Sequence, residues 1–205
     1  MSKRYWSIVA AVAVLAALAG MYVARELRAP DPVPLASGTA YPTPAPLEPF
    51  SLVDSRGGEV TPESLRGHPT LVFFGFTNCP DVCPTTLAQL VSIQKQDQVP
   101  GLKVALITVD PERDTPEQIG RYVAAFGGDI IGLTGSMPEI VKAQQSFGAA
   151  SRRAEQPGGG YSVDHSATVF VLDSAARKVA VFTPPLRPEA MARDLVALAP
   201  ALRNR

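Results

Sequence analysis

The sequence predicts an α/β fold with a central mixed sheet flanked by helices, preceded by an N-terminal transmembrane helix. Three observations predict this class. From residue 50 onward, short apolar runs alternate with segments of helical periodicity, which is typical of parallel strands joined by helices. Near the C-terminus, two apolar runs are separated by a short polar turn, which predicts an antiparallel hairpin. Residues 5–24 form one long apolar run.

The N-terminal run has the length of a membrane span. Its 20 residues, at about 1.5 Å per residue, match the roughly 30 Å of bilayer hydrocarbon. We therefore expect residues 5–24 to be a transmembrane anchor or an uncleaved signal. Positively charged residues favour the cytoplasmic side, so Lys3 and Arg4 predict that residues 1–4 are a cytoplasmic tail and that the rest of the chain lies on the other side of the membrane. We expect a single-pass protein of a bacterial inner membrane with a periplasmic domain, because no Arg/Ser-rich transit segment comes first. A cleaved signal peptide is the alternative, since "ALA" at 17–19 resembles a cleavage site.

A proline-rich segment follows the apolar run. Residues 25–46 are predicted to be a linker, because the stretch 29–49 contains seven prolines and such segments extend as polyproline II spacers. The remaining residues, 47–205, are predicted to form one domain. The whole chain has 19 basic and 19 acidic residues. It therefore lacks the excess of positive charge that attracts nucleic acid, and we expect no nucleic-acid partner.

The elements of the domain are predicted in chain order from apolar runs and capping signals. Buried strands are expected at 70–76 and 102–109, and the strands of the hairpin at 167–173 and 178–183. Helices are expected from Pro84, over 115–127 with Thr115 as cap, over 136–148 with a Ser136–Glu139 capping box and Gly148 as stop, and over 188–199.

The two cysteines lie in one short stretch, "FFGFTNCPDVCPTTL" at 73–87, directly after the first strand. The carboxyl ends of parallel strands are where open α/β sheets place their sites. With a helix beginning at Pro84, Cys83 lies at its cap and Cys79 one loop earlier. The helix dipole is expected to lower the pKa of both thiols. Two neighbouring thiolates are soft ligands suited to copper(I) or zinc.

A third ligand is expected from the two histidines of the chain. His68 precedes the strand 70–76, so we expect it at the opposite end from the cysteines as a surface turn residue. His165 precedes the strand 167–172, which we expect to pair antiparallel with 70–76, so that His165 approaches the cysteines. The triple glycine 158–160 predicts a mobile loop leading to it.

The chain resembles the SCO/SenC copper chaperones, which are membrane-anchored proteins with a thioredoxin-like fold. The matching segments are "FFGFTNCPDVCPTTL", "ITVDPERDTP" and "YSVDHSATVFVLD". The resemblance implies that Cys79, Cys83 and His165 bind copper(I), with copper(II) as a second state. It implies delivery of copper to the binuclear copper site of cytochrome c oxidase subunit II, or reduction of that subunit's cysteines, after loading by an upstream copper donor. Envelope oxidants would crosslink the cysteines, so an upstream thioredoxin-like reductant is also expected.

Asp110 follows the second strand and has two interpretations. It could hydrogen-bond a ligand or tune its charge. Alternatively, Asp110, Arg113 and Asp114 brace the next helix.

Three other functions compete with metal binding. A thiol–disulfide oxidoreductase without copper transfer is the main alternative, although thioredoxin-type enzymes usually have two residues between their cysteines where this chain has three. A peroxiredoxin would need a threonine where Pro80 stands. A structural disulfide would close a very short loop and stabilise little. We expect a metallochaperone rather than an enzyme, with thiol–disulfide reduction as the enzymatic activity that the cysteine pair most favours.

Overall fold

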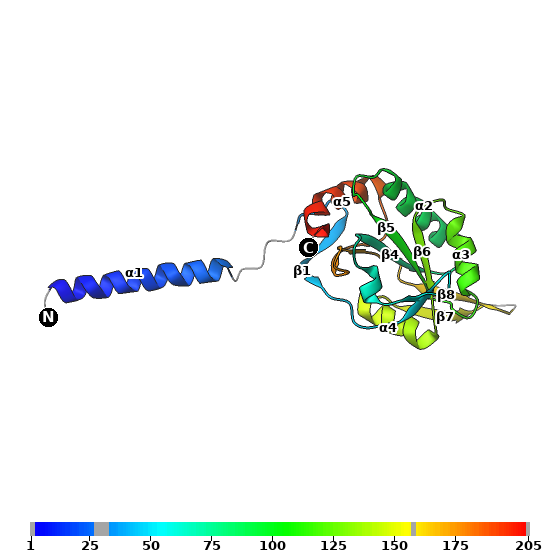
Figure 1. Ribbon diagram of the computed structural model, residues 1–205, viewed down its shortest axis with the longest axis horizontal. Helices are drawn as coiled ribbons and strands as arrows, with labels where there is room; N and C mark the ends of the chain where they lie inside the picture. The colour runs from blue at the N-terminus through cyan, green and yellow to red at the C-terminus, as the bar shows by residue number, and fades with distance from the viewer. Residues whose placement is uncertain (1–2, 27–32, 157–158, 204–205) are drawn as a thin grey trace. The chain divides into compact units, whose positions relative to one another are not determined.

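The computed structural model describes residues 3–26, 33–156 and 159–203 (Figure 1). The chain divides into two compact units, residues 1–32 and 33–205. The first unit contains one helix, α1 (Lys3–Glu26). Within the described residues, none of the helices combines the length and the apolar character needed to cross a membrane. The structure therefore does not support the transmembrane anchor predicted over 5–24, and part of the predicted tail, residues 1–2, lies outside the described residues.

The second unit is built on an eight-stranded mixed sheet with the order β1-β10-β9-β4-β5-β6-β2-β3. Its central strands are parallel: β4 (Thr70–Gly75), β5 (Lys103–Thr108) and β6 (Ile130–Thr134). The flanking strands pair antiparallel: β1 (Gly38–Ala45), β2 (Leu52–Asp54), β3 (Glu59–Val60), β9 (Val169–Leu172) and β10 (Lys178–Phe182). A separate two-stranded sheet joins β7 (Ser151–Glu155) to β8 (Tyr161–His165).

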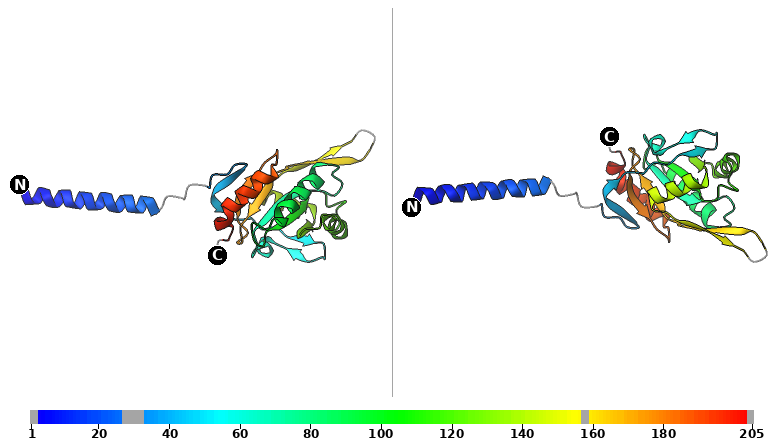
Figure 2. Two further views of the ribbon diagram at one scale, coloured as in Figure 1. Left: turned by 90° about the horizontal axis from the view of Figure 1, so that it is seen from above. Right: turned by 90° about the horizontal axis from the view of Figure 1, so that it is seen from below.

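Helices cover both faces of the main sheet, as the sequence predicts. They are η1 (Pro62–Leu65), α2 (Val82–Lys95), α3 (Pro116–Ala124), α4 (Met137–Phe147) and α5 (Pro188–Leu202). Helices α2 and α5 lie together on one face and α4 lies on the other (Figure 2). The predicted α/β architecture with a central mixed sheet flanked by helices, the hairpin and the antiparallel pairing of β9 with β4 are therefore confirmed, whereas the transmembrane helix of the predicted class is not.

Every residue of β4 is buried, so both of its faces are packed. Phe74 points to the α4 face, where its ring lies 5.5 Å from that of Phe147 and 6.2 Å from that of Phe170, centroid to centroid. Because side chains alternate along a strand, Phe73 points the opposite way. Aromatic side chains thus fill the α4 face of β4. The segment that contains the cysteines packs against the opposite face, where Cys83 lies beside Gly75 and Phe73.

The capping predictions have mixed outcomes. Thr115 caps α3 by accepting a hydrogen bond from the Gln118 N–H, and Gly148 ends α4 with φ of 81°. The Ser136–Glu139 capping box is wrong, because Ser136 makes no side-chain capping bond. Glu139 instead accepts a hydrogen bond from the Ser51 N–H at 2.8 Å, so a long-range partner outcompetes the local one.

The predicted linker over 25–46 is wrong for residues 38–45, which form β1 at the edge of the sheet. An edge strand tolerates proline because its outer N–H groups need no partner. Asp194 of α5 holds the entry to this strand, since its buried carboxylate accepts hydrogen bonds from the N–H groups of Ala36, Ser37 and Gly38 at 2.7–3.0 Å. Residues 27–32 of the predicted linker lie outside the described residues.

Strand β6 and the loop before β8 complete the comparison with the sequence prediction. Strand β6 was not predicted, because Gly132 interrupts a short apolar run. The predicted mobile loop at 158–160 lies between β7 and β8, and its residue 158 falls outside the described residues. His165 is the last residue of β8 and so lies at the end of the β7–β8 hairpin.

Candidate metal centre

The cysteine segment connects β4 to α2 at the carboxyl end of the central strand. Helix α2 begins at Val82, two residues before the predicted start at Pro84, with Asp81 as its N-cap residue. Cys83 therefore lies inside the first turn of the helix and is fully buried, whereas Cys79 lies in the preceding loop and is half-buried. The Cys83 N–H points at Cys79 Sγ, with 3.4 Å between the two atoms. Both cysteines are free thiols.

Gly75, the last residue of β4, makes room for the buried sulfur. A Cβ atom at this position would lie 3.0 Å from Cys83 Sγ and 2.9 Å from Phe73 Cε1. Non-bonded heavy atoms normally sit about 3.5–4.0 Å apart. The absence of a side chain at Gly75 therefore lets the Cys83 sulfur pack directly against the strand.

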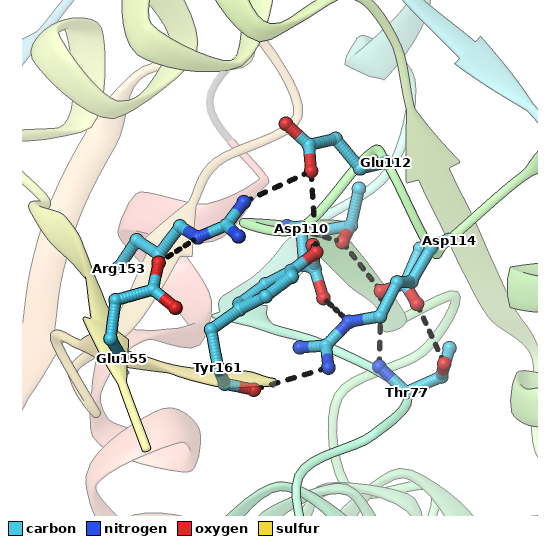
Figure 3. Close-up of polar contacts among 9 residues, drawn as sticks. Thr77, Asp110, Glu112, Asp114, Arg153, Glu155 and Tyr161 are labelled. Atoms are coloured by element: carbon cyan, nitrogen blue, oxygen red, sulfur yellow. Dashed lines mark hydrogen bonds and ion pairs between the residues drawn. The ribbon is translucent and has the colours of Figure 1, made fainter. Parts of the chain in front are cut away.

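Asp114 holds the start of the cysteine loop. Its buried carboxylate accepts hydrogen bonds from the Thr77 N–H at 3.0 Å, from Thr77 Oγ1 at 2.6 Å and from Thr108 Oγ1 at 2.6 Å (Figure 3). These contacts tie the loop after β4 to the end of β5. The sequence motif predicted a brace for helix α3, and the structure adds this role at the cysteine loop.

His165 reaches the cysteines because β9 pairs antiparallel with β4, as predicted. Phe73 is paired with Val169, so the residues just before β9 lie beside the carboxyl end of β4. His165 Nε2 lies 3.4 Å from Cys83 Sγ. The rings of Phe73 and Phe76 flank the imidazole edge-on, each with its centroid 5.8 Å away.

The other ring nitrogen of His165 is held by the backbone. Nδ1 lies 3.2 Å from the carbonyl oxygen of Ser166. An Nδ1–H that donates to this carbonyl leaves Nε2 with a free lone pair directed at the sulfur. Burial lowers the pKa of His165, against the raising effects of the Ser166 carbonyl and the Asp164 charge. The neutral imidazole, which is the form that binds metal, is therefore favoured.

The expectation of a lowered thiol pKa is wrong for Cys83. Burial raises the pKa of the Cys83 thiol, and its hydrogen bond with Cys79 raises it further. A hydrogen bond with the Phe76 backbone lowers this pKa, but the desolvation of the buried thiolate outweighs it. The cationic charge of a bound metal would reverse this balance, because coordination deprotonates a thiol.

The three groups are close enough to share one ion. One ligand atom from each of Cys79, Cys83 and His165 lies within 4.8 Å of the others. Metal–sulfur bonds of about 2.3 Å and metal–nitrogen bonds of about 2.0 Å put neighbouring ligand atoms roughly 3.5–4 Å apart. The donor set of two sulfurs and one imidazole therefore fits a single soft cation after small side-chain adjustments. His68 is exposed in a turn before β4, as predicted.

Asp110 does not belong to this group of three. It is buried after β5, where it pairs with Arg113 and accepts a hydrogen bond from the Tyr161 hydroxyl at 2.8 Å (Figure 3). Both carboxylate oxygens are therefore engaged with side chains other than the predicted ligands. Arg113 and Tyr161 are residues that the sequence analysis did not connect to the site.

Comparison with known proteins identifies the family. The SCO1/SenC family model matches residues 39–200. The chain belongs to the SCO1/SenC family. Among relatives, it is 32% identical over 183 residues to the SCO2-like protein RP587 of Rickettsia prowazekii, covering 86% of this chain and 89% of that protein. It is 41% identical over 127 residues to Protein SCO1 homolog 1, mitochondrial, of Arabidopsis thaliana, covering 60% of this chain and 38% of that protein.

Solved structures of SCO1/SenC proteins share the fold. The crystal structure of Arabidopsis thaliana ScoI with copper bound has a TM-score of 0.70 and 34% identity, covering 74% of this chain and 96% of that one. BsSco, described with a disulfide switch and as a member of the Sco family of cytochrome c oxidase assembly proteins, has a TM-score of 0.61 and 27% identity, covering 78% and 96%. The chain spans under half of the Arabidopsis SCO1 homolog 1 and of the Danio rerio SCO2 homolog, with 38% and 46% of their lengths matched.

Proposed function

We propose that this SCO1/SenC protein binds one copper ion through Cys79, Cys83 and His165 and takes part in cytochrome c oxidase assembly. The observation that carries the proposal is the meeting of two sulfurs and one imidazole nitrogen within 4.8 Å. Thiolates together with one imidazole form a soft, three-coordinate donor set that suits copper(I). The relative solved with copper bound supports copper over zinc.

The unequal burial of the ligands supports a transfer role. Cys83 is fully buried, while Cys79 and His165 are half-buried. An incoming thiolate of a partner can therefore displace the accessible ligands first, while Cys83 retains the ion until the exchange is complete. We propose that the acceptor is the binuclear copper site of cytochrome c oxidase subunit II and that an upstream donor loads the protein.

The same asymmetry supports a second candidate function, thiol–disulfide exchange with one specific partner. A half-exposed Cys79 could attack a partner disulfide, forming a mixed disulfide and releasing one partner thiolate. Cys83 would then attack Cys79, forming the Cys79–Cys83 disulfide and releasing the second partner thiol. Two electrons pass from this dithiol to the partner, so the protein would depend on an upstream thioredoxin-like reductant.

Copper binding is tested by titrating the reduced full-length protein with copper(I) against a competing chelator. We expect one equivalent to bind, with weaker binding in His165→Ala and a larger loss in Cys83→Ser. His68→Ala is the matched control, because the exposed His68 lies at the other end of β4. Equal affinity in the His165→Ala and His68→Ala variants would remove His165 from the site.

A transfer experiment separates the two candidate functions. The copper-loaded protein is mixed with subunit II whose copper-site cysteines are either reduced or oxidised. Copper that moves only into the reduced subunit supports the chaperone function. Reduction of the oxidised subunit by the metal-free dithiol, without copper movement, supports the exchange function.

Membrane attachment is a proposal from the sequence. The apolar run at 5–24 and the preceding Lys3 and Arg4 support a single-pass inner-membrane protein with a periplasmic domain. Extraction of cell membranes at alkaline pH tests it: an integral protein stays with the lipid, and release into the supernatant would refute the anchor.

A further inference from the structure

The position of His165 depends on a hairpin that lies outside the main sheet. Strands β7 and β8 form their own two-stranded sheet, and His165 is the last residue of β8. The hairpin extends away from the rest of its domain in both views of Figure 2. Because an isolated two-stranded hairpin is marginally stable in water, side-chain contacts with the domain must hold β8 in place.

One face of β8 carries these contacts. Side chains alternate along a strand, so Tyr161, Val163 and His165 share a face. Val163 is buried on this face, whereas Asp164 on the other face is exposed. Tyr161 and His165 occupy the two ends of the strand, about 13 Å apart at roughly 3.3 Å per residue. A contact that fixes Tyr161 therefore fixes the direction in which His165 is presented.

The ring of Tyr161 is stacked between two guanidinium groups. The Cζ atom of Arg113 lies 4.0 Å from the centroid of the tyrosine ring, and that of Arg153 lies 3.6 Å away. Two groups this close to one ring centre must stack on its opposite faces. The tyrosine hydroxyl donates a hydrogen bond to Asp110 Oδ1 at 2.8 Å and also lies 3.4 Å from Glu112 Oε2 (Figure 3).

Asp110 and Arg113 connect Tyr161, and with it β8, to the carboxyl end of the main sheet. We call Asp110, Arg113 and Tyr161 the clamp. Arg113 donates a hydrogen bond to the backbone carbonyl of Tyr161 at 3.2 Å and pairs with Asp110, which follows β5. The guanidinium of Arg113 also lies 5.8 Å from the ring centroid of Phe76, the same ring that flanks His165. Burial and the hydrogen bond to Asp110 raise the pKa of Tyr161 to about 12, so the hydroxyl remains a donor at neutral pH.

We propose that Asp110, Arg113 and Tyr161 are positioning residues that hold β8 so that His165 Nε2 stays beside the cysteine sulfurs. Among the contacts of the described residues, none joins Asp110, Arg113 or Tyr161 to a ligand atom, so these three residues act through the orientation of the strand. This inference deepens the proposed copper function and rests on it for the metal-binding measurements, while the metal-free measurements stand independently.

The metal-free test observes the two histidines of the full-length chain by NMR. In Tyr161→Leu we expect the His165 ring signals to broaden or move toward those of an exposed imidazole, and the amides of Val163 and His165 to exchange faster. Tyr161→Phe, which keeps the stacked ring and loses the hydroxyl, should show a smaller change. The exposed His68 is the internal control. Unchanged His165 signals in Tyr161→Leu would overturn the proposal.

The metal-bound test is a double-mutant cycle on copper(I) affinity. Tyr161→Leu should weaken binding about tenfold, the lower end of the effect of groups that orient metal ligands. In a His165→Ala background the same change should have no further effect, because the clamp then has no ligand to position. Arg152→Ala is the matched hairpin control, since Arg152 pairs only with the exposed Asp164 among the described residues and should leave affinity unchanged.

The outcomes separate the possible failures. An equal loss of affinity in both backgrounds would overturn the positioning role, because the clamp would then act on the cysteines or on the fold. A wild-type protein that binds no copper(I) would refute the proposed function, and the NMR experiment would still decide whether the clamp holds His165.

Discussion

Replacing Gly75 by alanine should impair the metal centre more than it impairs the fold. The new methyl group would lie 3.0 Å from Cys83 Sγ and 2.9 Å from Phe73 Cε1. Heavy atoms in contact need about 3.5–4.0 Å, so the sulfur must retreat by roughly 0.5–1 Å. Metal–ligand distances tolerate only about ±0.2 Å. The displacement therefore exceeds what the site can absorb without losing affinity.

The stability cost of this change should be moderate. Overpacking of a core position by one methyl group typically costs about 1–3 kcal/mol, which leaves most domains folded. We expect Gly75→Ala to unfold at a lower denaturant concentration and to bind copper(I) at least about tenfold more weakly, as for other disturbances of ligand orientation. Competition with a copper(I) chelator and urea unfolding of the metal-free protein measure the two effects separately.

Gly132→Ala is a matched control on β6. A Cβ there would lie 3.0 Å from Ile119 Cγ1, so it meets a similarly close neighbour on a strand that is separated from β4 by β5. It should lower stability comparably and leave copper affinity unchanged. A Gly75→Ala variant that folded and bound copper(I) as tightly as this control would refute the displacement of the Cys83 sulfur.

Three further predictions follow from buried carboxylates and thiols. Asp114→Asn should lower the free energy of unfolding by about 1–3 kcal/mol, because Thr77 loses a charged acceptor; an unchanged urea midpoint would contradict this. Cys79 is half-buried and Cys83 is fully buried, so iodoacetamide should modify the metal-free Cys83→Ser variant faster than Cys79→Ser, and equal rates would contradict the burial difference. Burial raises the pKa of Asp194, but the hydrogen bonds from residues 36–38 outweigh it, so the folded pKa is lowered. Its stabilisation is thus fully present above the unfolded value of about 4 and lost as pH falls through the folded value. Asp194→Asn should cost about 1.5–3 kcal/mol at neutral pH, and this difference from wild type should vanish in acid; a difference independent of pH would refute the assignment.

Elements with strong local signals were predictable. Strand β4 is a continuous apolar run, and Thr115 with the following proline marks the start of α3. The antiparallel pairing of β9 with β4 followed from these elements and placed His165 near the cysteines. Strand β1 was mistaken for a linker because prolines within it resemble a spacer, and its docking depends on Asp194, which lies 158 positions from Ala36.

The amino-acid sequence by itself determined the alternation of strands and helices and the pairing of Cys79 with Cys83, because these depend on residue type and short spacing. It also indicated His165, which lies 82 positions from Cys83, through the expected strand pairing and the family motifs. The tertiary structure alone decided how the site is built. It buries Cys83 against Gly75, which raises the thiol pKa where the helix start suggested a decrease. It also stacks the ring of Tyr161 between the guanidinium groups of Arg113 and Arg153. Burial and stacking depend on which distant segments pack together, and no local pattern carries that information.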